Sequence, residues 1–313
     1  NNGHYEYNSE GGACCVSNCK RAVFTECIFS AQKTRESCGG INITAKSILE
    51  VQNCQFNRCI TGSNKESYGG GICYSLHSSD ELDRSRDEDI SITDCAFEEN
   101  EGYNGVSLFL NVTTLNIHIS NIEILNHLTS DHIFCINFNE KITNDILIMN
   151  NISFIGNSHN SKVIKDFCGG SGICFSSAKE LKKLIVQFVN CNFEYNRSPV
   201  NGGAFGYDMK DDQKEIDFIF DNCHFKHNLC ELSGGACHFC SNNTIDIINC
   251  EFINNTSKGT KSNSGGGSIG ICSSAELITI HGCKFIIKDC IFSENNAEFG
   301  GAISIESSGN YEI

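Results

Sequence analysis

Hydrophobic residues recur along this chain in one short pattern, which the sequence repeats nine times. The pattern reads apolar-x-apolar-x-x-Cys-x-Phe, and an asparagine usually stands three residues after the phenylalanine. Two clear copies are Phe218-x-Phe220-x-x-Cys223-x-Phe225 and Ile245-x-Ile247-x-x-Cys250-x-Phe252. Because successive side chains of a strand point to opposite faces, apolar-x-apolar and Cys-x-Phe each predict a short strand with one buried face.

The aligned positions of these copies predict three columns of side chains. The core-facing cysteines are Cys27, Cys54, Cys95, Cys191, Cys223, Cys250 and Cys290. The core-facing phenylalanines are Phe29, Phe56, Phe97, Phe154, Phe193, Phe225, Phe252 and Phe292. A third column predicts an amide ladder that hydrogen-bonds from repeat to repeat, made of Asn100, Asn157, Asn196, Asn228, Asn255 and Asn295. We expect the cysteines of the core to pack as free thiols.

Turn residues divide each repeat into strands. An Asn or Asp residue, such as Asn53 or Asp94, precedes the cysteine position in eight of the nine copies. These residue types tolerate the left-handed conformation that a tight corner needs. Glycine pairs such as Gly202-Gly203 and Gly300-Gly301 supply a further turn, after which a third strand begins.

Three strands per repeat predict one coil of a solenoid, because a single coil cannot bury its own apolar side chains. We therefore expect an all-β, right-handed parallel β-helix with three sheets and about nine to ten coils, forming one domain over residues 1–313. Every third coil carries a longer loop, which gives a super-repeat of roughly 98 residues. The resulting blocks are approximately 1–75, 76–173, 174–271 and 272–313.

The composition favours a location outside the cell. The chain contains 21 cysteines and several Asn-x-Ser/Thr sequons, a combination that favours an oxidising, secreted setting. A formal net charge of −15 argues against nucleic acid as a partner. Apolar runs are too short to cross a bilayer, so we expect no membrane insertion. The chain opens at Asn1 without a leader pattern, and we therefore expect a processed or partial form.

Several residues are candidates for modification or metal binding. The cysteines near turns are candidate disulfide partners: Cys38, Cys59, Cys168, Cys230, Cys237 and Cys240. The best glycosylation candidates are Asn42, Asn111, Asn242 and Asn254. Zinc at Cys237 and Cys240 with His224 or His227 is disfavoured, because strand residues three apart face opposite ways. The acidic loop at 80–89 is interpreted as solvated rather than as a calcium site, since it lacks EF-hand spacing. We expect no cofactor.

The repeats resemble those of a known family. Phe292-Ser-Glu-Asn295 followed by Gly300-Gly301-Ala302-Ile303 is similar to the FxxN and GGA[IVL] repeats of chlamydial-type polymorphic membrane proteins. Similar repeats occur in large surface proteins of protists, and a protist member fits the frequent cysteines and sequons better than a bacterium. The resemblance implies a β-helical domain that acts at a cell surface, often in adhesion, and it supplies no catalytic residues.

These observations predict a structural function. Neither end of the sequence resembles a solenoid cap, so we expect copies of the chain to stack head to tail in a fibre or cell-surface layer. The alternative is an adhesin that binds surface glycans or cell-surface proteins. A second alternative is a polysaccharide lyase or hydrolase, which needs carboxylates grouped on one outer face. The outward strand positions are mostly Ser, Thr, Asn and scattered acids, so we predict no enzyme activity.

Overall fold

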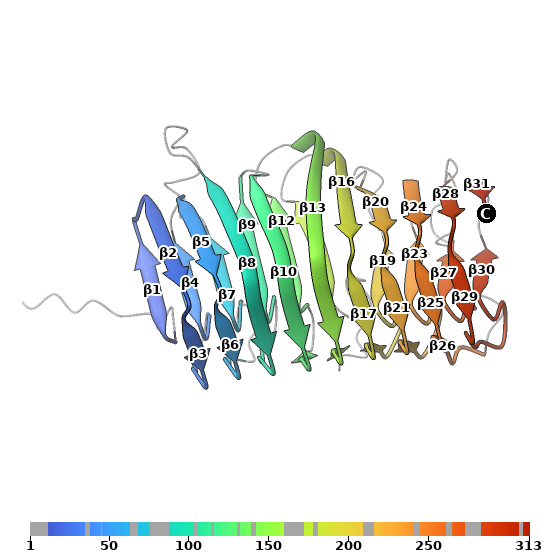
Figure 1. Cartoon of the computed structure of the whole chain (residues 1–313), viewed down its shortest axis with the longest axis horizontal. Coiled ribbons are helices and arrows are strands. Elements are labelled where there is room, and N and C mark those ends of the chain that lie inside the picture. The colour runs from blue at the N-terminus through green and yellow to red at the C-terminus, as the bar shows by residue number, and fades with distance from the viewer. Residues whose placement is uncertain are drawn as a thin grey trace, which may run out of the picture.

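The computed structural model describes most of the chain as a stack of β-strands. The described residues are 12–34, 38–44, 46–62, 68–75, 88–102, 105–113, 116–129, 132–138, 142–159, 172–177, 181–208, 216–240, 244–260, 265–272, 283–306 and 309–313. Figure 1 shows an elongated molecule in which the strands succeed one another in chain order from β1 to β31. The strand pairs are parallel in all four sheets. The prediction of an all-β chain with long parallel sheets is confirmed, and the arrangement is compatible with a solenoid.

The longest sheet contains the repeated pattern itself. Its main path is β2 (Arg21–Thr25), β5 (Ile48–Gln52), β8 (Asp89–Glu98), β10 (Ile117–Leu125), β13 (Ile142–Ile155), β16 (Leu181–Val189), β20 (Ile216–Asp221), β24 (Thr244–Ile248), β28 (Cys283–Lys288) and β31 (Gly309–Glu312). A second path joins β3 (Ile28–Ser30), β6 (Gln55–Asn57), β17 (Asn192–Glu194), β21 (His224–Lys226), β25 (Glu251–Ile253) and β29 (Ile291–Ser293) to it.

Three further sheets complete the stack. One contains β1 (Cys14–Ser17), β4 (Ile41–Thr44), β7 (Ile72–Ser75), β9 (Leu108–Val112), β12 (Phe134–Phe138) and β15 (Ile173–Ser177). Another contains β19 (Phe205–Asp208), β23 (Cys237–Cys240), β27 (Ile269–Cys272) and β30 (Ile303–Glu306). The last is short: β11 (Leu128–Thr129), β14 (Ser158–His159), β18 (Arg197–Ser198), β22 (Leu229–Cys230) and β26 (Thr256–Ser257).

The sheet count differs from the predicted three, and the predicted third strands of the repeats are divided between two sheets, β1 to β15 and β19 to β30. The two arms of each repeat belong to one bent sheet, because a single corner residue joins them and β8, β10 and β13 run through the corner. The fourth sheet follows the asparagine ladder directly and consists of two-residue strands. Strands this short carry no sequence period, which is why the pattern of hydrophobic residues did not predict them.

The predicted corner before the cysteine position is confirmed by the backbone. The residues there have φ between 52° and 55°: Asn53, Asp94, Asn121, Asn151, Asn190, Asn222, Asn249 and Asp289. A second corner lies two residues after each phenylalanine position, and it was not predicted. Its residues also have positive φ but share no residue type: Ala31, Arg58, Glu99, Asn126, Gly156, Tyr195, His227, Asn254 and Glu294.

Stacked phenylalanines fill the interior behind these corners. Phe193, Phe225 and Phe252 are register partners in neighbouring strands. Their ring centroids are 4.7 Å apart at each step, with 2° between the ring planes. This spacing equals the usual separation of hydrogen-bonded strands, about 4.8 Å, so the rings follow the backbone without adjustment.

The asparagine column lies at the edge of the same core. Asn228 donates from Nδ2 to the Phe193 carbonyl at 2.8 Å and to Asn255 Oδ1 at 3.0 Å. Its Oδ1 accepts hydrogen bonds from the backbone N–H and from Nδ2 of Asn196. Each buried amide therefore satisfies a backbone group of an adjacent repeat, which ties consecutive repeats together.

Candidate functional site

The outer side of the first corner forms an open polar groove. Asn121 Nδ2 donates to Asp94 Oδ1 at 2.8 Å, and Asn151 Nδ2 donates to Asn121 Oδ1 at 2.9 Å. These side chains line a groove of about 450 Å³ together with Asn53, Gln55, Glu123 and Ser153. The groove presents amide and carboxylate groups at the regular strand spacing, so it can hydrogen-bond an extended polar ligand.

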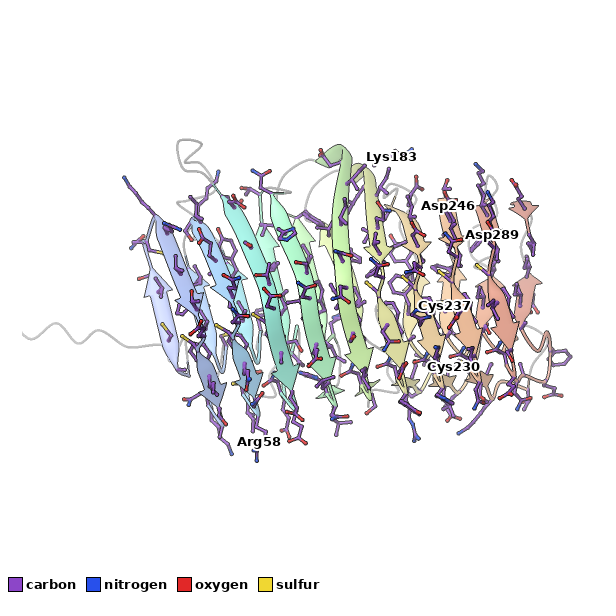
Figure 2. The ribbon with its side chains drawn as sticks, viewed as in Figure 1. Arg58, Lys183, Cys230, Cys237, Asp246 and Asp289 are labelled. Atoms are coloured by element: carbon purple, nitrogen blue, oxygen red, sulfur yellow. The ribbon has the colours of Figure 1, made fainter. Side chains whose placement is uncertain are left out.

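Two acidic residues lie on neighbouring strands of the outer face. Asp217 on β20 pairs with Lys183 Nζ at 3.5 Å, and its Oδ1 accepts a hydrogen bond from the Thr244 N–H at 2.8 Å. On β24, burial raises the pKa of the Asp246 carboxyl, and the positive charge of Lys284 partly offsets this increase. Figure 2 shows Lys183 and Asp246 on this part of the stack. We expected only scattered outward acids, so this pair was not predicted; the alternation of polar and apolar residues on β20 and β24 was the signal.

Aliphatic side chains also face outward, contrary to the expected polar surface. Ile146 and Ile148 on β13 are 53% and 49% exposed. Ile185 on β16 pairs with Ile146, and Ile219 on β20 pairs with Gln187 of β16. Both isoleucines are partly buried. Leu147 and Met149, the two residues that the repeat pattern places toward the core, are buried, so Ile146 and Ile148 at the alternate positions face outward.

The predicted disulfide partners are wrong where the structure describes them. Cys38, Cys59, Cys230 and Cys237 are buried and form no disulfide. Burial raises the pKa of the Cys59 thiol to about 11 and that of Cys230 to about 12, and it also raises the pKa values of Cys38 and Cys237 well above their ordinary value. A thiol that resists ionisation is a poor partner for disulfide exchange. Cys168 and the Cys240 side chain lie outside the described residues.

The column cysteines are thiols with backbone partners. Cys223 donates to the Phe188 carbonyl at 3.4 Å, and Cys250 donates to the Phe220 carbonyl at 3.4 Å. The other five are also outside any disulfide: Cys27, Cys54, Cys95, Cys191 and Cys290. They act as small core side chains. The sulfur of Cys27 contacts the Thr25 carbonyl, and each of the others contacts a carbonyl of the preceding repeat.

Metal ligands do not gather in the described part of the chain. Cys237 faces the core on β23, and its neighbour His238 is on the opposite face of the strand. Among the described residues no three His, Cys, Asp or Glu side chains are placed to hold an ion. The acidic loop at 80–87 lies outside the described residues.

The glycosylation candidates differ in accessibility. Asn42 on β4 is only 3% exposed, so this candidate lies within the stack and not on its surface. Asn111 on β9 is partly buried and its Oδ1 accepts a hydrogen bond from Asn137 Nδ2 at 2.9 Å. Asn254 is exposed at the second corner. Asn242 lies outside the described residues.

One histidine takes the place of an asparagine in the amide ladder. His127 follows Ile124 by three residues and is 1% exposed. Its Nδ1 faces Asn157 Oδ1 at 3.2 Å, and its Nε2 faces Ser107 Oγ at 2.8 Å and Asn100 Nδ2 at 3.3 Å. Burial lowers its pKa to about 4. This residue was not predicted, although its place in the repeat points to it.

Comparisons with known proteins found no relationship. No protein-family model matches the chain, and neither a curated protein nor a solved structure resembles it significantly. The described part of the chain also contains no helix long and apolar enough to cross a membrane.

Proposed function

We propose that this chain is a right-handed parallel β-helix of about nine to ten coils that serves as a non-catalytic structural component of an extracellular fibre or cell-surface layer. Copies would stack head to tail, and each would continue the β-sheets of the previous one. The repeats' resemblance to polymorphic membrane proteins supports a position at the cell surface.

This proposal is supported by core side chains that are incompletely buried at both edges of the described stack. Phe24 and Phe29 at one edge are only partly buried, as are Phe292 and Ile305 at the other, whereas the phenylalanines of the stacked column between them, from Phe56 to Phe252, are fully buried. Among the described strands, the outermost ones also have a hydrogen-bonded neighbour on one side only. Burying these groups requires a further coil, which another copy can supply.

Electron microscopy of the purified chain tests the assembly. We expect fibres or rods longer than one molecule, whose length increases with protein concentration. Ile305→Lys places a charge on the edge face and should leave single short rods, since a lysine there cannot be covered by a second coil. Ser304→Lys changes the adjacent outward position and should assemble like the parent. Single rods at every concentration from the parent protein would refute the fibre.

Adhesion is the second candidate, and the polar groove at the first corner favours it. Asp94, Asn121 and Asn151 already form a regular ladder there, and sugar hydroxyl groups are suitable partners for such amides. A panel of immobilised glycans tests this function. Binding that Asn121→Ala abolishes would support it, while equal binding by the variant would place the contact elsewhere.

A further inference from the structure

The described sequons differ in burial, and apart from the partly buried Asn111 they fall into two structural classes. Asn196 and Asn255 belong to the buried amide ladder, and Asn42 is also buried. Asn151 and Asn254 are exposed at the two corners. A sequon in the first class cannot carry a glycan in the folded chain, because the sugar would have to enter the core. The fold therefore separates sequons that the sequence presents as equivalent.

Asn254 and Asn255 are adjacent sequons with opposite surroundings. Asn255 uses its Nδ2 to donate to the Phe225 carbonyl at 2.8 Å and to Asn295 Oδ1 at 3.1 Å. A glycan on Asn255 would remove one of these hydrogens and break the ladder. Asn254 projects from the corner, where its backbone has φ 55°. Its Nδ2 contacts His227 Nδ1 at 3.0 Å, a bond that the one hydrogen left after glycosylation can still make.

An aromatic platform lies beside Asn254. His227 and Tyr195 occupy the same corner position in the two preceding repeats, and their rings stack with centroids 4.7 Å apart and 6° between planes. Tyr195 is 53% exposed. Exposed aromatic rings and an adjacent amide suit the apolar C–H face and the hydroxyl groups of a sugar.

We propose that Asn254 carries an N-linked glycan whose first sugar packs against His227 and Tyr195. This inference rests on the extracellular location proposed above. The donor is a lipid-linked oligosaccharide diphosphate. The sugar C1 forms a bond to Nδ2 of Asn254 as its bond to the phosphate oxygen breaks, Nδ2 loses one proton, and the lipid diphosphate leaves.

Expression of the full chain in glycosylating, secreting eukaryotic cells tests the site. Peptide mass spectrometry should find the glycan on Asn254 and unmodified Asn196 and Asn255, and Asn254→Gln should remove one glycan from the intact mass. Glycans on other sequons with Asn254 empty would overturn this inference but leave the extracellular proposal standing. A chain secreted behind an added signal peptide but carrying no glycan would also overturn the inference alone, whereas a native protein that stays inside its own cells would overturn both.

A second measurement tests the platform. Enzymatic removal of the glycan should lower the melting temperature of the parent protein and leave that of Tyr195→Ala unchanged. Glu294→Ala, at the same corner on the other side of Asn254, is the matched control and should respond like the parent. An equal drop in the parent and in Tyr195→Ala would overturn the packing of the sugar on the rings.

Discussion

Replacement of His127 by asparagine should remove a pH-sensitive point from the amide ladder. Asn157 Oδ1 already accepts a hydrogen bond from the backbone N–H of His127, and Asn100 Nδ2 donates to the Phe56 carbonyl. The neighbours therefore require a neutral ring with the proton on Nδ1 and an accepting Nε2. Protonation of Nε2 would place an N–H against the Asn100 amide inside the core.

The pKa of His127 sets the size of this effect. It is lowered from 6.5 to about 4 by burial, so the unfolded chain takes up a proton at a higher pH than the folded one. Stability is therefore complete above pH 6.5 and is lost as the pH falls toward 4. With about 1.4 kcal/mol for each factor of ten in proton affinity, the loss is about 2 kcal/mol at pH 5 and approaches about 3 kcal/mol near pH 4.

Urea unfolding followed by circular dichroism at pH 7.5, 6 and 5 measures this loss. His127→Asn should have similar stability to the parent at pH 7.5 and should be the more stable protein at pH 5, because its side chain does not titrate. His118→Asn, which changes an exposed histidine on β10, should keep the parent's pH dependence. Identical pH dependence in the parent and in His127→Asn would refute the reasoning.

Three further predictions test the core, the thiols and the corner. Phe225→Ala should lower the free energy of unfolding in urea by about 3–5 kcal/mol, since the ring is stacked on both sides. Tyr195→Ala, which changes an exposed ring, should lower it by less than about 1 kcal/mol, and similar losses in the two variants would contradict the stacked core. An alkylation assay at pH 8 should label four cysteines only after unfolding, because burial raises their thiol pKa values: Cys38, Cys59, Cys230 and Cys237. Labelling of these cysteines in the native protein would contradict their burial. Asn249→Val should lose about 1–2 kcal/mol from the strained corner, while Asn249→Gly should stay within about 1 kcal/mol of the parent, as thermal unfolding would measure.

The parts of the fold that were predictable depend on residue type. The first corner could be predicted because nearly all its residues are Asn or Asp, which tolerate positive φ. The second corner was not predicted, since Arg58, Tyr195 and His227 adopt the same conformation without any shared preference. Stacking against the neighbouring repeats imposes that conformation, so the local sequence does not predict it.

The candidate site was less predictable than the fold. The buried position of Asn42 depends on the packing around β4, which the pattern of one strand does not contain. His127 was missed because its residue type differs from the asparagines of the ladder, although its spacing from Ile124 is the same. The cysteines assigned to disulfides lie near turns as expected, but the fold buries them instead of pairing them.

A crystal structure of the chain at side-chain resolution tests the central claim most directly, which is that successive repeats stack in parallel around one shared core. We predict Phe193, Phe225 and Phe252 one above another in neighbouring parallel strands, with Asn196, Asn228 and Asn255 hydrogen-bonded beside them. Antiparallel hairpins turning at Asn222 and Asn249 would contradict the account.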